Sequence, residues 1–192
     1  NDNSTDRTPI AASEFITASK DKSAHRMRLV YNPFSGKKRA VRYGIDKSSG
    51  EVILTTDADC AVGPEWVRRH ASWYIGGGPD VVLAPVTQRP AAGFWHSFGD
   101  YEFAALQAIT EATAVAGHPV MCNAANMSFR RDVYLRYADS LHPDLASGDD
   151  MFLLHAVMRD GGTVRHEGSD AAAAETAGAV TAAALVRQRA RW

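Results

Sequence analysis

Two aspartates at the end of a short apolar segment form the most prominent group of residues in this sequence that could carry out chemistry. Asp57 and Asp59 closely follow Val52–Leu54, whose β-branched and apolar residues predict a buried strand. Residues two apart in an extended chain project to the same side, so these carboxylates are expected to converge where the strand leaves its sheet. Paired oxygen ligands suit Mg²⁺ or Mn²⁺ and, through the ion, a diphosphate. The alternative is a loop with two solvated acids.

A second acidic group precedes an apolar helical pattern. Gly148, Asp149 and Asp150 stand directly before Met151–Met158. Acids at the start of a helix commonly serve as caps and as partners of the helix dipole. Two adjacent acids also suit a general base, because a neighbouring negative charge makes a carboxylate a better proton acceptor. The sequence leaves both interpretations open.

Two basic groups complete the candidate site residues. On a helix, Gln188 lies beside Arg191 and Trp192 at spacings of three and four residues. An amide, a guanidinium and an indole on one face can hold a diphosphate and a sugar or acceptor ring. The cluster Gly36–Ala40, which includes Lys37, can meet phosphates. The alternatives are a basic helix end with one core tryptophan and a solvated helix face.

Length and composition limit the classes of protein to which the chain can belong. The sequence has 192 residues, 45% hydrophobic and 22% charged, which is ordinary for one globular domain. A formal net charge of −1 provides no field that would recruit nucleic acid. We find no signal peptide, and the apolar runs are too short to span a bilayer. Cys60 and Cys122 are interpreted as reduced thiols of a cytosolic protein.

Strand and helix patterns alternate through the first half of the chain and predict an α/β fold. The expected strands are Met27–Tyr31, Val52–Leu54, Asp80–Val86, Thr163–His166 and Val120–Arg130, the last with a loop in it. The expected helices begin at Pro9 and at Gly63 and cover Lys37–Ile45, Gly93–Ala116, Asp132–Tyr137, Gly148–Arg159 and Leu185–Trp192. Alternation favours a mostly parallel mixed sheet with helices on both faces. The Ala-rich segment Asp170–Ala184 has no clear pattern.

In this order, the segments resemble the family 2 glycosyltransferases, which have the Rossmann-like GT-A fold, a three-layer sandwich. The segments that carry the resemblance are Asn1–Thr8 (the loop after the family's second strand), Gly36–Ala40 (Gly-Lys-x-x-Ala), Asp57–Asp59 (Asp-x-Asp), Cys122–Arg131 (the acceptor-side segment), Gly148–Asp150 (Glu-Asp) and Gln188–Trp192 (Gln-x-x-Arg-Trp). Two positions depart from the family pattern, since Arg42 replaces an asparagine and Asp149 replaces a glutamate.

The resemblance implies a metal-dependent, inverting transfer of a sugar from a nucleotide-diphosphate sugar, expected to be a UDP-sugar, to a carbohydrate or lipid-linked acceptor hydroxyl. It implies Asp150 as the catalytic base and Asp59 as the ligand of Mg²⁺ or Mn²⁺. The implied nucleotide-sugar contacts are Asp2 at the uracil, Asp57 at the ribose, Gln188 and Arg191 at the diphosphate, and Lys37, Asp149 and Trp192, the last also beside the acceptor.

Two other functions are compatible with these residues. Haloacid-dehalogenase phosphatases also use Asp-x-Asp after a strand, but they place Thr or Val where this chain has Ala61. A non-catalytic fragment that binds a nucleotide sugar is the second alternative. We expect residues 1–192 to form a single GT-A catalytic domain truncated at both ends. By the same resemblance, the parent protein is expected to be cytoplasmic and membrane-anchored at the inner face of the membrane.

Overall fold

The computed structural model describes residues 1–18, 27–142, 145 and 148–190, which form two compact units. Unit 1 contains residues 1–49 and residue 145, and unit 2 contains residues 50–142 and 148–190, within these described ranges. The single catalytic domain expected over the whole chain stays a prediction.

Unit 1 contains helices α1 (Thr8–Ala18) and α2 (Lys37–Asp46). Both agree with the helix starts expected from the sequence, and the Thr8 N–H donates to the Asp6 carboxylate at 2.9 Å. The prediction of a strand at Met27–Tyr31 is wrong, because this segment joins no sheet among the described residues. It hydrogen bonds with Asn1: the Asn1 nitrogen donates to Val30 O at 2.7 Å, and Asn32 N–H donates to Asn1 O at 2.9 Å. These two bonds have the pattern of a parallel ladder.

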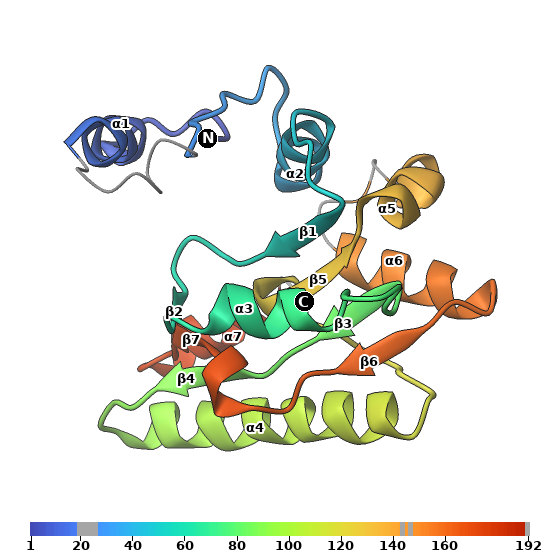
Figure 1. The fold of residues 1–192 in the computed structure, drawn as a ribbon. Coiled ribbons are helices and arrows are strands. Elements are labelled where there is room, and N and C mark those ends of the chain that lie inside the picture. The colour runs from blue at the N-terminus through green and yellow to red at the C-terminus, as the bar shows by residue number, and fades with distance from the viewer. Residues whose placement is uncertain (19–26, 143–144, 146–147, 191–192) are drawn as a thin grey trace. The chain divides into compact units, whose positions relative to one another are not determined.

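The larger sheet of unit 2 has four strands in the order β1 (Val52–Thr55), β5 (Met127–Arg130), β3 (Val81–Leu83) and β6 (Val164–His166). Strand β5 is antiparallel to both β1 and β3, whereas β3 is parallel to β6. Strands β1, β3 and β6 therefore share one direction, and β5 opposes them. This arrangement confirms the mixed sheet expected from the sequence (Figure 1).

A second sheet of unit 2 has three strands in the order β2 (Ala61–Val62), β7 (Ala174–Ala177) and β4 (Val86–Arg89). The single strand predicted at Asp80–Val86 is wrong, because it is divided into β3 and β4. Pro85 lies at the division, and proline cannot donate a ladder hydrogen bond. Strand β7 lies inside the Ala-rich segment, for which the sequence shows no clear pattern.

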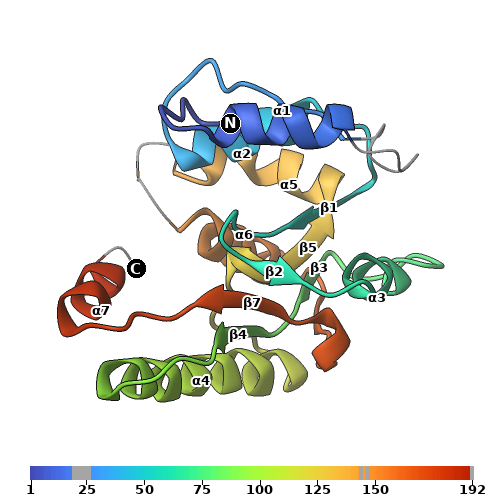
Figure 2. The ribbon, with the colours of Figure 1, turned by 90° about the vertical axis from the view of Figure 1, so that its left-hand side faces the viewer.

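Helices pack against these sheets (Figures 1 and 2). The helices of unit 2 are α3 (Trp66–Ser72), α4 (Phe94–Val115), α5 (Arg131–Tyr137), α6 (Asp149–Arg159) and α7 (Ala182–Arg189), with short 3₁₀ turns η2 (Ala124–Asn126), η3 (Ala138–Ser140) and η4 (Asp170–Ala172). Helix α4 contacts β4 and β6 and has a buried face that includes His96, Gly99 and Phe103. Helix α7 packs beside α4.

Both faces of the larger sheet are covered. Val81, Val82 and Leu83 of β3 are at most 1% exposed, and consecutive strand residues point to opposite faces. Met127 and Phe129 of β5 are also buried. This burial confirms an α/β fold with helices on both sides of the sheet. In the part of the chain that the structure describes, no helix has the length and apolar character needed to cross a membrane.

Gly78 is a position where unit 2 leaves no space for a side chain. A Cβ on Gly78 would lie 1.8 Å from the backbone oxygen of Trp73, which cannot move without disturbing the end of the α3 segment. We expect Gly78→Ala to lower the free energy of unfolding by about 3 kcal/mol. A urea unfolding curve measures this loss. Gly63→Ala is the control, because a Cβ there meets nothing within 4 Å, and an equal loss in both variants would contradict the packing argument.

Candidate active site

The acidic pair occupies the connection between the two sheets of unit 2. Strand β1 ends at Thr55, the acidic turn with Asp57 and Asp59 follows, and the chain then enters β2 of the second sheet. The Cys60 N–H donates to Asp57 O at 3.1 Å and closes the turn. Asp57 is half-buried, whereas Asp59 is exposed. Asp59 is therefore exposed to solvent on a turn that is anchored at one end by each sheet.

Asp149 and Asp150 are the first two residues of α6, and both are half-buried. The carboxylate of Asp150 accepts a hydrogen bond from its neighbour Met151 N–H at 2.9 Å, one of the first-turn N–H groups that have no partner within the helix. It also accepts one from Ala124 N–H in η2, at 2.9 Å. Asp150 is therefore oriented by a segment distant in sequence as well as by its own helix.

The acidic turn and η2 lie at the same edge of the larger sheet. Strand β5 runs antiparallel to β1, with Met127 opposite Thr55, and the Thr55 hydroxyl donates to Met127 O at 3.1 Å. The turn follows Thr55 and η2 precedes Met127, so both leave the sheet at this edge. The side chain of Cys60 packs against a cluster of Val86, Phe103 and Ala125.

Cys60 thus packs on the cluster that contains the residue after Ala124, and Ala124 binds Asp150. Through these contacts the structure brings Asp57, Asp59 and Asp150 to one edge of unit 2. The acidic turn and the Ala124-bound Asp150, which lie far apart in sequence, are therefore both at this edge of the larger sheet.

Two cysteine side chains accompany the acids, and the sequence analysis assigned neither of them a role in the site. Cys60 Sγ lies 3.9 Å from Asp59 Oδ1, and burial, followed by the charge of Asp59, raises the pKa of this thiol. Burial also raises the pKa of Cys122 well above its ordinary value, with further contributions from Asp150 and Asp149. Both are free, protonated thiols at neutral pH. The sequence could have indicated both positions, because Cys60 directly follows Asp59 and Cys122 shortly precedes η2.

Helix α7 follows a strand that borders the same edge. Glu175 of β7 pairs with Ala61, so Thr176 lies toward Cys60 and hydrogen bonds with it. The Thr181 hydroxyl caps α7 by accepting from Ala184 N–H at 3.2 Å.

Of the basic group that the sequence predicted on α7, only Gln188 falls in the described part of the chain. Gln188 is half-buried, and its amide oxygen has no hydrogen-bond partner among the described residues. Arg191 and Trp192 lie outside the described residues. The neighbouring Arg189 pairs with Glu102 of α4 at 2.8 Å. This ion pair, which the sequence did not indicate, ties α7 to α4.

The predicted nucleotide contacts Asp2 and Lys37 belong to unit 1. The Asp2 carboxylate accepts hydrogen bonds from Asn32 Nδ2 at 2.8 Å and from Gly36 N–H at 3.2 Å. Asp2 therefore fixes the turn that precedes α2, while a carboxylate retains further lone pairs for a ligand. Lys37 is the first residue of α2 and is exposed.

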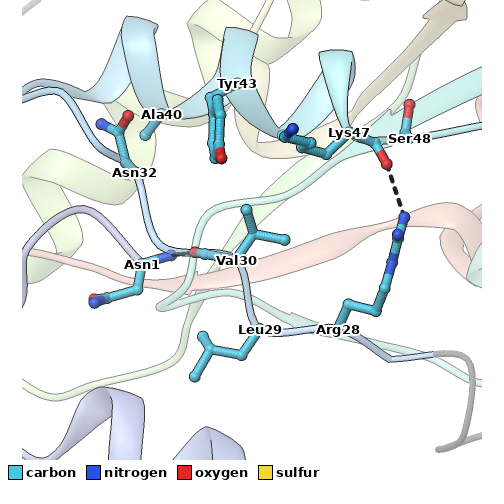
Figure 3. A pocket seen from close by; sticks show the side chains of 10 residues that line it. Asn1, Arg28, Leu29, Val30, Asn32, Ala40, Tyr43, Lys47 and Ser48 are labelled. Carbon is cyan, nitrogen blue, oxygen red and sulfur yellow. Dashed lines mark hydrogen bonds between the residues drawn. The ribbon is translucent and has the colours of Figure 1, made fainter.

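Unit 1 also contains a cavity of about 380 Å³ between α2 and the extended segment that includes Leu29 and Val30 (Figure 3). Tyr43 and Lys47 line it from the α2 side, and the Arg28 guanidinium donates to Lys47 O at 2.8 Å. Neither Asp2 nor Lys37 belongs to its lining. The cavity is therefore not the site that the sequence predicted in this unit.

A buried polar network behind the site has no counterpart in the motifs of the sequence. The indole N–H of Trp66 can only donate, so its 2.9 Å contact identifies Asn126 Oδ1 as the acceptor. His70 Nε2, which is 3.0 Å from the same oxygen, must then carry a proton. Burial lowers the pKa of His70 and thereby favours the neutral ring. In that form Nδ1 accepts from the Ser128 hydroxyl at 2.8 Å, and the hydroxyl accepts from Tyr74 at 3.0 Å.

In the neutral form of His70, the network places the proton on Nε2. The i, i+4, i+8 spacing of Trp66, His70 and Tyr74 was the available sequence signal, because it aligns the three side chains on one side of α3 and the turn after it. The two donors of the Asn126 amide are also used, at 2.6 Å to Pro85 O and at 2.7 Å to Ala172 O. Both the oxygen and the nitrogen of the Asn126 amide are therefore fully engaged.

This network makes the stability of the protein depend on pH. Burial lowers the pKa of His70, so the folded state binds its proton less tightly than the unfolded chain does. The stabilisation is present above the ordinary histidine pKa and is lost as the pH falls below it. We expect the urea midpoint to decrease from about pH 7.5 to about pH 5.5, and to decrease less in His70→Gln. Burial also lowers the pKa of His166, so His166→Gln should weaken the pH dependence in the same direction. The control is His118→Gln, because His118 is exposed. An unchanged pH dependence in His70→Gln would contradict this assignment.

The donor set at the acidic turn fits a cation that shares its ligands with a substrate. Among the described residues, no group of three His, Cys, Asp or Glu side chains could hold a metal by itself. Mg²⁺ and related ions commonly take one or two carboxylates and complete their coordination with phosphate oxygens and water. Asp57 and Asp59 provide that kind of half-site.

Comparison with known sequences assigns the family. Residues 1–137 match the family described as Glycosyl transferase family 2, and the chain belongs to this family. Membership of this family excludes the alternative of a haloacid-dehalogenase phosphatase. Comparison with curated protein sequences gave no match.

Solved structures confirm the glycosyltransferase GT-A fold. A Pyrobaculum calidifontis mannosyltransferase, solved with GDP-mannose and Mn²⁺, is 18% identical with a TM-score of 0.74, over 99% of this chain and 49% of that one. Staphylococcus aureus TarS with UDP-GlcNAc is 17% identical with a TM-score of 0.59, over 93% and 48%. Mycobacterium tuberculosis glucosyl-3-phosphoglycerate synthase with Mn²⁺ and UDP-glucose is 16% identical with a TM-score of 0.51, over 99% and 64%. The chain thus spans about half to two thirds of these structures.

Proposed function

We propose that this chain carries the catalytic residues of an inverting glycosyltransferase that uses a nucleotide-diphosphate sugar, with a UDP-sugar as the first donor to test. The observation that carries the proposal is one edge of the larger sheet of unit 2 in a member of family 2. The acidic turn with Asp57 and Asp59 leaves the sheet there, as does the turn η2, whose Ala124 N–H binds Asp150. Related structures that hold GDP-mannose, UDP-GlcNAc or UDP-glucose support this donor class.

The donor end of the site consists of the acidic turn. Asp59 would hold Mg²⁺ or Mn²⁺ against the diphosphate, with Asp57 at the ribose, and complexes of two related proteins with Mn²⁺ support a divalent cation. When bound, the cation supplies Lewis-acid stabilisation of the negative charge on the leaving diphosphate. Gln188 and Arg191 would bind the diphosphate and Trp192 the acceptor. Asp149 would lie beside the donor. The nucleotide contacts expected at Asp2 and Lys37 of unit 1 stay predictions.

The acceptor end of the site consists of Asp150. Its carboxylate takes the proton of an acceptor hydroxyl while that oxygen attacks the anomeric carbon. The bond from the anomeric carbon to the diphosphate breaks, and the electron pair leaves with the nucleotide diphosphate. Attack from the opposite side inverts the anomeric configuration. The hydrogen bond from Ala124 N–H holds the carboxylate in a fixed direction during this step.

Calorimetric titration of UDP and of GDP into the chain, with and without Mn²⁺, tests the donor class. We expect one nucleotide to bind more tightly by at least about tenfold when Mn²⁺ is present. Turnover is then measured as nucleotide release from UDP-glucose, UDP-GlcNAc and GDP-mannose. Metal-dependent binding without release from any of these sugars would favour the non-catalytic alternative. The absence of binding by both nucleotides would overturn the proposal for this chain.

A further inference from the structure

Asn126 is the centre of a buried network that joins the segments flanking the candidate site. Its side chain is 1% exposed and contacts α3, the junction between β3 and β4, and η4. Each of these segments lies next to a part of the site. Helix α3 follows the acidic turn through β2, and η4 leads into β7, which pairs with β2. Asn126 itself ends η2, the turn whose first residue, Ala124, binds Asp150.

We propose that Asn126 is a positioning residue, which holds η2 so that the backbone N–H of Ala124 fixes the carboxylate of Asp150. This inference rests on the proposed role of Asp150 as the base. It assigns no contact between Asn126 and a substrate. The effect of Asn126 passes through the backbone of η2, so it differs from the roles of Asp57, Asp59 and Asp150.

The η2 turn is short and is closed by hydrogen bonds to Asn123. A displacement of Asn126 at its end therefore also displaces Ala124 at its start. Asn123 accepts Ala125 N–H through its side-chain oxygen at 3.0 Å and Asn126 N–H through its backbone oxygen at 3.1 Å. With Asn126 held by its amide on three sides, η2 has little freedom to rotate. The Ala124 N–H therefore has one direction, which is toward Asp150.

The chemistry of the network calls for an asparagine at this position. Two carbonyl oxygens, of Pro85 and Ala172, need donors, whereas Trp66 and His70 need an acceptor. A carboxamide offers two donors and an acceptor on one short planar group. An aspartate would place a carboxylate against two carbonyl oxygens, and an apolar residue would leave all these groups without partners.

The first test observes the Ala124 amide by NMR and needs no substrate. We expect Asn126→Ala to lower the hydrogen-exchange protection of Ala124 by about 10- to 100-fold and to abolish the response of its chemical shift to ionisation of Asp150. Asp150→Asn supplies the reference state. Val133→Ala is the matched control, because it truncates a side chain that is 2% exposed on α5, outside the network. Unchanged protection of Ala124 in Asn126→Ala would overturn the proposal.

The second test is a double-mutant cycle on nucleotide release. We expect Asn126→Ala to lower kcat about 100-fold with little change in the KM for the donor, and to have less than about a threefold effect in the Asp150→Asn background. A purely structural residue would lower activity equally in both backgrounds, and this result would overturn the proposal. If the native chain releases no nucleotide from any tested sugar, the proposed function fails, while the Ala124 measurement still decides the positioning role.

Trp66→Phe is the second variant, for use if Asn126→Ala does not fold cooperatively. It removes one donor to Asn126 Oδ1 and leaves the bonds to Pro85 and Ala172 in place. We expect a smaller loss of Ala124 protection, of about three- to tenfold. If the Ala124 amide kept its full hydrogen-exchange protection in this variant, the proposal that Asn126 holds Ala124 in place would be contradicted.

Discussion

Replacing Asp150 by asparagine is expected to lower the rate of sugar transfer by about 10²- to 10⁴-fold while donor binding stays nearly unchanged. The asparagine keeps the size of the side chain and an oxygen that can accept from Ala124 N–H, but it cannot take a proton from the acceptor. The measurement is nucleotide release under single-turnover conditions, beside calorimetric titration of the nucleotide.

The magnitude of this effect separates the two interpretations of Asp150. A capping acid in the first turn of a helix contributes about 0.3–1 kcal/mol to stability, whereas the expected loss in rate corresponds to about 3–5 kcal/mol in the barrier. Asp132→Asn is the matched control, because Asp132 is an exposed acid in the first turn of α5. An equal loss of binding and turnover in Asp150→Asn would exclude Asp150 as the base.

Replacing Asp59 by alanine is expected to remove the dependence of nucleotide binding on the divalent cation. Asp59 is exposed at the turn and supplies the carboxylate that is proposed to bind the cation. With that carboxylate absent, affinity in Mn²⁺ should fall at least about tenfold and approach the affinity measured with EDTA. Titration of the nucleotide with and without Mn²⁺ measures both values.

Asp100→Ala controls for the loss of one negative charge in the Asp59 experiment. Asp100 is an exposed acid on α4 and lies outside the site. Its variant should keep the full difference between Mn²⁺ and EDTA. If Asp59→Ala also keeps that difference, the cation is bound elsewhere and the ligand role of Asp59 is wrong.

The order of the local motifs is readable from the sequence because each motif depends on neighbouring residues. A β-branched apolar run followed by Asp57 and Asp59 predicts a strand and an acidic turn, and the structure places β1 and the turn there. Gly148 before two acids and an apolar pattern predicts the start of α6. These local signals, taken in sequence order, are also what the chain shares with the glycosyltransferase family to which it belongs. The roles proposed for the residues stay predictions.

The predicted boundaries fail where local signals conflict with tertiary pairing. The apolar run at Asp80–Val86 predicts one strand, yet Pro85 divides it between two sheets. Alanines 172 and 174 show no pattern in the sequence, although both are fully buried where η4 and β7 join the core. Small buried residues carry little periodic signal, because their burial depends on close approach of neighbouring backbone.

Only the tertiary structure decided which distant residues meet at the site. The bond from Ala124 to Asp150 spans 26 positions, and the bond from Trp66 to Asn126 spans 60. The packing of Cys60 against the cluster of Val86, Phe103 and Ala125 and the pairing of Thr55 with Met127 likewise join remote segments. Sequence patterns report the secondary structure of a segment and the face that it buries. The partner of that face follows from strand order and register, which the whole chain determines when it packs.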